Sequence, residues 1–204
     1  MPWAGLTLLC GRHAHAIIAT ITAGRGPVPE GGLGMKEVRY AFRQVVPIMF
    51  AYIFVGLASG LLLQKAGYAP VWAFLSALFI YAGSMQIVMV TLMVSGVPLL
   101  LIAATTLFIN ARHVFYGLSF IEEFRAIGRR RGSFWKYPYM ALTLTDETYS
   151  VLCALKVPQG LDRGKVEFAI LLMCHMLWVV SCTAGAAIGS ALPVDMAGIE
   201  FSAT

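Results

Sequence analysis

Charged side chains are scarce in this sequence, and their absence from long stretches excludes most water-soluble folds. Asp, Glu, Lys and Arg make up 12% of the 204 residues, whereas soluble domains carry about a quarter. Between residues 45 and 121 the charged residues are Lys65 and Arg112 alone. So few charges cannot cover a surface that faces water, but they suit several helices that cross a lipid bilayer. The composition therefore predicts an all-α, polytopic membrane protein, and it excludes a nucleic-acid-binding module, a disordered chain and an extracellular disulfide scaffold.

Paired cysteines and known catalytic motifs are also missing. None of the four cysteines stands in a Cys-x-x-Cys pair, so the sequence indicates neither a disulfide framework nor a metal site. We expect Cys153, Cys174 and Cys182 to be small buried apolar residues. There is no Gly-x-Ser-x-Gly, His-Glu-x-x-His, P-loop or Rossmann fingerprint. A soluble enzyme, a bound cofactor and ATP-driven transport by this chain alone are therefore not indicated.

The two ends of the chain differ from its apolar middle. Residues 1–34 are rich in Gly, Ala and Pro, which predicts a disordered extension. We also consider that translation truly begins at Met35 and that the preceding residues come from a misplaced start. After Pro193 the sequence reads as the lead-in to another apolar helix. Residues 35–204 are thus predicted to be one transmembrane domain, truncated at its C-terminus.

Five apolar segments follow Met35. They cover approximately residues 47–64, 69–94, 98–120, 138–155 and 166–188. In the first segment, Pro47 suits the first turn of a helix, where its missing N–H would be unpaired in any case. The Gly56-x-x-x-Gly60 step would allow a neighbouring helix to approach closely.

Polar residues interrupt two of these segments. Segment 69–94 would measure about 40 Å as one straight helix, more than a bilayer core of about 30 Å, and it contains Gly83-Ser84. Segment 98–120 contains Asn110 to His113. Basic residues precede the first segment and follow the third, so the positive-inside rule places both on one side, which three full crossings would not allow. We therefore expect one interrupted segment to be re-entrant; the alternative is that this statistical rule fails here. No inverted repeat is visible.

Arg112 lies deep in its apolar segment, where an ionised group must face partners or water. Its candidate counter-charges are Asp146 and Glu147, the acidic pair of segment 138–155. One interpretation is a purely structural ion pair. The other is a cavity in which Arg112 meets an anionic group of a solute while Asp146 or Glu147 exchanges a proton, assisted by His113. A passive hydrogen-bonding role for His113 is equally open.

Gly83 and Ser84 predict an opening in the backbone of segment 69–94. The freed N–H groups at the start of the following half-helix would turn a positive dipole end toward a carboxylate. Ser84 and Gln86 would add neutral hydrogen-bonding groups. The alternative is a Gly-Ser kink that serves helix packing only.

Three motifs around these residues resemble those of one known family, the AzlC family of branched-chain amino acid exporters. Tyr81-Ala82-Gly83-Ser84-Met85-Gln86 is similar to its Phe-Ala-Gly-Ala-Ala-Gln-type motif. Asn110-Ala111-Arg112-His113, followed by Tyr116, resembles its Asn-Leu-Arg-His motif, with Ala111 in place of leucine. Leu144-Thr145-Asp146-Glu147 matches its Leu-Thr-Asp-Glu motif, and Gly198-Ile199-Glu200-Phe201 resembles a later Leu-Asp-Phe stretch. The motifs occur in order over about residues 38–204.

The resemblance implies the large subunit of a proton-coupled exporter of branched-chain amino acids, a multi-pass protein of the bacterial inner (plasma) membrane. It also implies a small AzlD-type membrane subunit as partner. We predict substrate contacts from Gly83, Ser84, Gln86, Asn110, Arg112 and Tyr116, and proton coupling through His113, Asp146 and Glu147. Three alternatives stay open. They are a transporter or channel for another small anionic or amino-acid-like solute, a membrane-embedded enzyme, and a purely structural membrane subunit.

Overall fold

The computed structural model describes residues 33–128 and 135–191, and every regular element within these ranges is an α-helix. The predicted all-α class is confirmed. The predicted extension over residues 1–34 and the lead-in to a further helix after Pro193 lie, apart from residues 33 and 34, outside the described residues.

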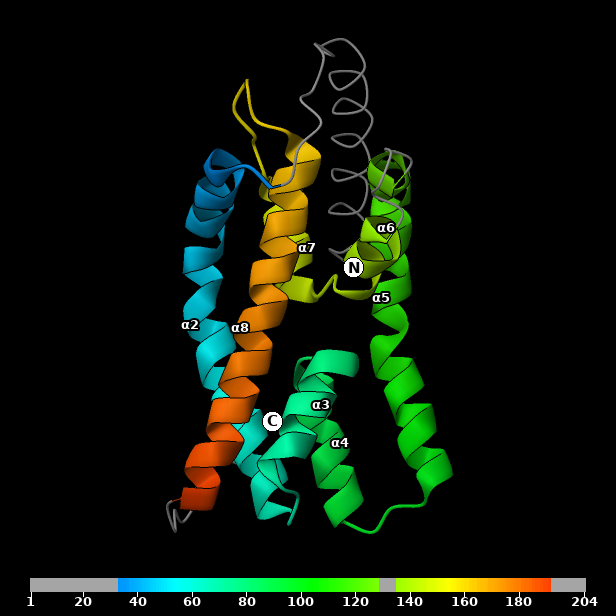
Figure 1. Ribbon diagram of the computed structural model, residues 1–204. Coiled ribbons are helices and arrows are strands. Elements are labelled where there is room, and N and C mark those ends of the chain that lie inside the picture. The colour runs from blue at the N-terminus through cyan, green and yellow to red at the C-terminus, as the bar shows by residue number, and fades with distance from the viewer. Residues whose placement is uncertain (1–32, 129–134, 192–204) are drawn as a thin grey trace.

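Three long helices form the frame of the molecule. They are α2 (Met35–Lys65), α5 (Leu99–Gly128) and α8 (Arg163–Ala191). At about 1.5 Å per residue, each exceeds the roughly 30 Å of a bilayer core, and each contains a stretch apolar enough to cross it. In Figure 1, α2 and α8 run side by side, and α5 stands on the other side of the molecule.

Pro47 lies inside α2 rather than in its first turn, which corrects the expected start of this helix. The basic, polar stretch before Pro47 is also helical, so the helix begins at Met35, before the apolar segment. Proline removes one helical hydrogen bond, to the carbonyl four residues earlier. That carbonyl belongs to Arg43, an exposed residue near the charged end of α2, so the lost bond is tolerated there.

Two pairs of short helices lie between the long ones. The lower hairpin consists of α3 (Pro70–Phe79) and α4 (Ser84–Val94), and the upper hairpin consists of α6 (Lys136–Leu142) and α7 (Asp146–Ala154). Figure 1 shows the first pair in the lower half of the molecule and the second in the upper half. Neither pair spans the full height, which is the shape expected of a re-entrant hairpin.

The structure confirms the predicted break in segment 69–94 and overturns the one predicted in segment 98–120. Helix α5 runs without a break through Asn110, Arg112 and His113. No glycine or proline stands among these residues, and arginine is a good helix former. The break instead falls in segment 138–155, which was expected to be continuous, at Thr143–Thr145.

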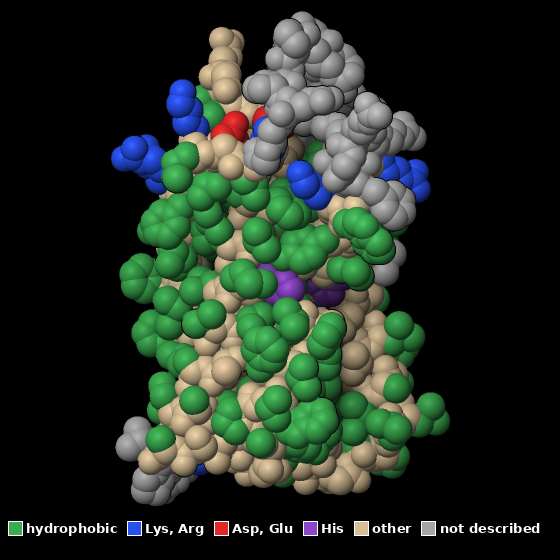
Figure 2. All heavy atoms as spheres, viewed as in Figure 1, with side chains coloured by type: hydrophobic (Ala, Val, Ile, Leu, Met, Phe, Trp, Pro, Cys, Tyr) green, Lys and Arg blue, Asp and Glu red, His purple; other side chains and the backbone are tan. Residues whose placement is uncertain are grey.

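This arrangement explains how the basic residues before the first apolar segment and those after the third can lie on the same side. The chain descends through α2, turns back within the lower hairpin, ascends through α5, turns back within the upper hairpin and descends through α8 (Figure 1). Lys36 and Arg39 at the start of α2 therefore lie at the same end as Arg125 and Lys136. Figure 2 shows Lys and Arg side chains gathered at that end, above a broad hydrophobic band.

The order of elements also contains an inverted pair. A long helix followed by a half-length hairpin occurs first as α2 with α3 and α4, and again as α5 with α6 and α7, in the opposite orientation (Figure 1). Inverted repeats of this kind place a binding site near the middle of the membrane in many transporters. The sequence shows no matching repeat, so the symmetry is one of architecture.

Helices α2 and α8 pack closely through glycine, as the Gly56-x-x-x-Gly60 step predicts. A Cβ at Gly60 would overlap the main-chain carbonyl of Cys182, and a Cβ at Gly185 would overlap the main chain of Leu57. Cys174 and Cys182 are buried as expected, whereas Cys153 is exposed, which corrects that prediction. Cys153 lies on the last turn of α7, where few neighbours cover it.

Candidate functional site

The tip of the lower hairpin is a turn whose backbone conformation few residue types adopt. Gly83, the residue before α4, has φ +55° and ψ −123°, a conformation that favours glycine. Tyr81 also has a positive φ, +41°, which is costly for a residue with a Cβ. Its ring packs 4.5 Å from that of His175, and its hydroxyl donates a hydrogen bond to the Tyr52 hydroxyl at 3.4 Å. These contacts hold the strained turn in place.

Threonines shape the tip of the upper hairpin. Thr145 precedes α7 and forms a capping box with Thr148, in which each side chain bonds the main-chain N–H of the other. Such a box starts a helix and satisfies two N–H groups of its first turn. The Thr145 hydroxyl also lies 2.6 Å from the hydroxyl of Tyr52. Tyr52 of α2 therefore connects the tips of both hairpins.

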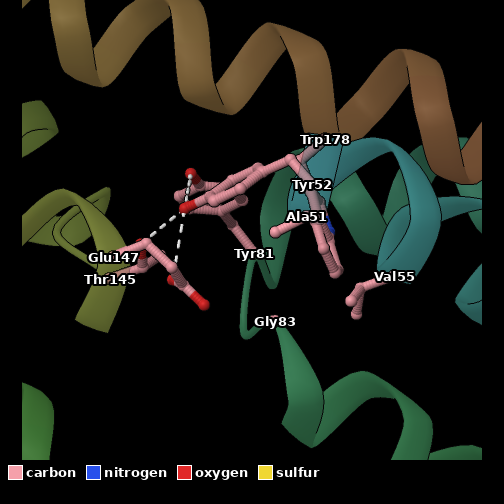
Figure 3. A pocket seen from close by; sticks show the side chains of 8 residues that line it. All are labelled: Ala51, Tyr52, Val55, Tyr81, Gly83, Thr145, Glu147 and Trp178. Carbon is pink, nitrogen blue, oxygen red and sulfur yellow. Dashed lines mark hydrogen bonds between the residues drawn. The ribbon is translucent and has the colours of Figure 1, made fainter. Parts of the chain in front are cut away.

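A cavity of about 70 Å³ lies where the two tips meet (Figure 3). This volume holds several water molecules. Its lining residues come from α2, both hairpin tips, α7 and α8: Ala51, Tyr52, Val55, Tyr81, Gly83, Thr145, Glu147 and Trp178. The residues that precede α4 and α7 both line it, so two helix N-termini converge here. First-turn N–H groups and the positive ends of two helix dipoles suit an anionic group at this point.

Glu147 is the carboxylate of this cavity. Its side chain is exposed within the chain, and its Oε2 accepts a hydrogen bond from the Tyr52 hydroxyl at 3.4 Å (Figure 3). Ala51, Val55 and Trp178 form apolar wall on the other sides. The cavity thus combines a carboxylate, two helix N-termini and an apolar surface.

A second polar cluster lies beside the cavity, between α5 and α7. Arg112 Nη1 and Asp146 Oδ2 are 2.6 Å apart, with side chains 39% and 36% exposed. The pair is therefore neither sealed in a dry interior nor free in solvent. The Tyr116 ring stacks on Tyr149 of α7 at 4.5 Å, and the His113 ring lies edge-on to Tyr116 at 6.0 Å.

Three polar atoms of this second cluster are buried without a hydrogen-bond partner among the described residues. They are Asn110 Oδ1, Arg112 Nε and Asp146 Oδ1. Buried polar atoms are nearly always bonded in folded proteins, so three in one place indicate that a further polar group or water belongs there. Neither here nor elsewhere in the described ranges is a group of three or more His, Cys, Asp or Glu side chains arranged to hold a metal ion.

The structure thus distributes the predicted site residues over three places. Gly83 and Glu147 line the cavity. Asn110, Arg112, His113, Tyr116 and Asp146 lie on the two helices of the second cluster. Gln86 is buried and accepts a hydrogen bond from the Trp178 indole at 2.7 Å. Ser84 begins α4, and its side chain lies outside the described part of the structure.

The sequence interpretation missed Tyr52 and Trp178. Both are buried, and their rings meet edge-on at 5.6 Å. An aromatic residue in an apolar segment is as readily explained by lipid or core packing, so its type alone carries no functional signal. A buried tyrosine hydroxyl needs a hydrogen-bond partner. That requirement is the one sign in the sequence that Tyr52 contacts other polar residues.

Comparison with known proteins agrees with these motifs. The AzlC protein family matches residues 47–192. This chain belongs to the AzlC family. Among relatives of this AzlC protein, an uncharacterized membrane protein of Haemophilus influenzae is 34% identical over 83% of the chain and 67% of its own length. An uncharacterized membrane protein of Helicobacter pylori strain 26695 is 32% identical over 83% of the chain and 72% of its own length.

One relative carries a functional name. The branched-chain amino acid transport protein AzlC of Bacillus subtilis is 28% identical over 81% of the chain, and the match spans 63% of the relative's length, less than two thirds. No solved structure matches the chain. The protein described here is accordingly an AzlC-family membrane protein, built from apolar helices.

Proposed function

We propose that this chain is the large membrane subunit of a secondary exporter of branched-chain amino acids, and that the substrate binds in the cavity between the hairpin tips. The convergence of two helix N-termini on that cavity is the observation that carries the proposal. Transporters with broken helices bind anionic substrate groups at such half-helix N-termini near the membrane midplane. The name of the Bacillus subtilis relative supplies the substrate class.

The substrate carboxylate would bind at the openings of α4 and α7. Gly83 leaves the backbone of α4 accessible because it has no Cβ. Ser84 would add a hydroxyl at this opening. Gln86 would contribute indirectly, because it accepts the hydrogen bond that holds the Trp178 indole. Arg112 would draw the anion toward α7, supported by Asn110 and Tyr116, because its Nε makes no hydrogen bond to any described residue.

The aliphatic side chain of the substrate would face the apolar wall. Ala51, Val55 and Trp178 present methyl groups and an aromatic face to the cavity. Burying one methylene group is worth about 0.8 kcal/mol, so a branched side chain binds this wall better than the side chain of glycine or alanine. The Trp178 ring is fixed by its bond to Gln86, which gives the wall a defined shape.

Glu147 would carry the coupling proton, with Asp146 and His113 in supporting roles. Glu147 lines the cavity itself, whereas the Asp146 carboxylate is engaged by Arg112 at 2.6 Å. Because this ion pair occupies the Asp146 carboxylate, we assign the coupling proton to Glu147. The inverted hairpins would expose Glu147 to the two sides of the bacterial inner membrane in turn.

Helix α5 would contact the small AzlD-type partner subunit. In its most apolar stretch, 6% of the residues are buried, against 33% in that of α2 and 56% in that of α8. The same helix holds Arg112, whose side chain is 39% exposed, and an arginine at this depth requires cover by protein or water rather than lipid. A membrane subunit packed on α5 would supply that cover.

Transport by the reconstituted protein tests the proposal. The chain is placed in lipid vesicles with its small partner subunit, and movement of labelled leucine is measured with and without a pH gradient. We expect leucine exchange in both conditions and net flux that rises with the gradient. In E147Q, exchange should remain and the rise should disappear, whereas E122Q, at an exposed carboxylate near the end of α5, should behave as wild type.

Two results would contradict the proposal. Vesicles that carry correctly inserted protein and yet exchange no branched-chain amino acid would exclude the substrate class. Exchange of another small anionic solute in the same vesicles would then favour the alternative transporter. A pH-gradient response that survives in E147Q would exclude Glu147 as the proton carrier.

A further inference from the structure

A buried hydrogen bond joins the lower hairpin to α8 beside the cavity. The indole N–H of Trp178 donates to Gln86 Oε1 at 2.7 Å, and each of the two residues is 3% exposed. Gln86 stands on the first turn of α4, three residues after Gly83. The bond therefore connects a helix that begins at the cavity to a ring that lines the cavity.

The orientation of the Trp178 ring is set by this bond together with two tyrosine rings. The centroid of the Trp178 ring lies 5.6 Å from that of Tyr52 and 6.5 Å from that of Tyr81, both edge-on. Aromatic pairs are found over a range of about 4.5–7 Å, so these contacts alone leave the ring some freedom. The bond to Gln86 removes that freedom, because a buried N–H without an acceptor is costly.

The fixed ring limits the size of the group that the cavity can hold. Trp178 contributes one wall, and Ala51 and Val55 of α2 contribute another (Figure 3). The cavity measures about 70 Å³, roughly half of the 150 Å³ of an engineered protein cavity that binds benzene. An aliphatic group of about three or four carbons therefore comes close to filling it, whereas a six-carbon ring exceeds it.

We propose that Trp178 selects the substrate by the size of its side chain, and that Gln86 is the residue that positions Trp178. The inference rests on the proposed transport function and deepens it. The site takes amino acids with a small branched aliphatic side chain and rejects those with an aromatic one. Gln86 acts through the indole alone, in place of the direct substrate contact that the sequence predicts.

The chemistry of the pair explains what an amide provides at this position. A leucine of similar size would fill the same buried space, and it would not need partners for polar atoms. What Gln86 adds over leucine is an acceptor for one N–H, and with it a defined angle of one ring. That angle matters at Trp178 because the ring faces the cavity.

Exchange of two amino acids tests the size limit. The protein is placed in vesicles with its small partner subunit, and the exchange rates of labelled phenylalanine and labelled leucine are compared. We expect W178F and Q86L each to raise the phenylalanine-to-leucine ratio by about tenfold or more, since hydrophobic pockets discriminate by about 10–200-fold for each methylene. W72F, at an exposed tryptophan of α3, should keep the wild-type ratio. An unchanged ratio in W178F overturns the size limit.

A double substitution separates positioning from direct contact. W178F lacks the indole N–H, so in that background Q86L should have no further effect, and W178F and Q86L/W178F should share one ratio and one apparent affinity for leucine. A further change in Q86L/W178F would overturn the positioning role and favour direct contact of Gln86 with the substrate. A lower unfolding temperature of Q86L with the wild-type ratio would overturn it as well, because the bond would then serve stability only.

A third variant tests the size limit without disturbing the buried core. Ala51 lines the cavity from α2 and is exposed within the chain, so A51L narrows the cavity from its outer side. We expect A51L to reduce leucine exchange more than alanine exchange. Equal reductions would overturn the size limit even if W178F does not reach the membrane. The failure of the proposed function looks different, because the wild-type protein itself would then exchange no leucine, and the inference would fall with it.

Discussion

Asp146 and Glu147 are neighbours on the first turn of α7, yet their side chains serve different contacts. Asp146 pairs with Arg112 of α5, and Glu147 reaches the Tyr52 hydroxyl of α2. At the residue scale, the first turn of α7 therefore joins the second polar cluster to the cavity. Because the two carboxylates share this turn, a change of charge at one alters the electrostatic potential at the other.

Substitution of Arg112 separates a structural ion pair from a functional arginine. R112A leaves the Asp146 carboxylate without its partner, and we expect this to cost about 1–3 kcal/mol of stability, between the values for exposed and buried pairs. R112A/D146A should recover much of that loss. The measurement is the unfolding temperature in detergent, and leucine exchange should stay low in both variants.

The exchange result decides between the two roles. Recovery of both stability and exchange in R112A/D146A would mean that the pair is purely structural. R125A is the matched control, because Arg125 is an exposed arginine of the same helix, and it should change neither quantity.

Tyr52 connects the two hairpin tips through one hydroxyl. We expect Y52F to lower stability by about 1–3 kcal/mol and to weaken the contact between the tips. The lost hydroxyl contacts Thr145, Glu147 and Tyr81, and one hydrogen bond contributes about 1 kcal/mol net. Thermal unfolding measures the first effect, and a lower apparent affinity for leucine in the exchange assay measures the second. The control is Y68F, since Tyr68 lies outside the cavity, between α2 and α3. Equal affinities in Y52F and wild type would contradict the linking role.

Residues with an unusual type for their surroundings were predictable from the sequence. Gly83, Arg112, Asp146 and Glu147 stand out because a Gly-Ser pair or a charge is unusual in an apolar segment. Trp178 does not stand out, since its side chain suits such a segment. Its role depends on the hydrogen bond that its indole donates to Gln86, whose position relative to α8 only the folded chain defines.

At the scale of elements, the two breaks have different chemical causes. Gly83 opens the lower hairpin with a backbone conformation that favours glycine, and the sequence predicted this break correctly. The upper hairpin breaks at Thr143–Thr145, where threonine side chains bond the main chain in place of helical partners. In the sequence this break is indicated by the Thr145-x-x-Thr148 spacing alone. That signal is weaker than the polar run Asn110–His113 of α5, which suggested a break where none forms.

The packing of α2 against α8 depends on a lack of side chain at Gly60. We expect G60A to lower the free energy of unfolding by about 1–3 kcal/mol, since the added Cβ would overlap the main chain of Cys182. G117A in α5 is the matched control. A Cβ there meets nothing within 4 Å, so this change should stabilise the helix by up to about 1 kcal/mol. Unfolding of both variants in detergent gives the comparison, and equal effects would contradict the close packing.

At the scale of the whole molecule, charge and architecture agree once the lower hairpin is counted as re-entrant. The basic residues were readable from the sequence, but the assignment of the non-crossing segment was not. Polar residues interrupt both segment 69–94 and segment 98–120 in the sequence. Of these two segments, the chain reverses direction only in 69–94, at Gly83. The second re-entrant hairpin lies where the sequence suggested a full span, so the inverted pair emerged only from the arrangement in space (Figure 1).

Labelling from one side of the membrane tests this topology. In a background without cysteine, K36C, K65C and S95C each place one thiol at an exposed position, and an impermeant maleimide is added to vesicles of known orientation. Because α3 and α4 enter and leave at the same end, Ser95 should share a side with Lys65 and lie opposite Lys36. A full crossing by residues 69–94 would instead place S95C with K36C. The hairpin tips would then no longer meet at the cavity, and the convergence of two helix N-termini on which substrate binding depends would be lost.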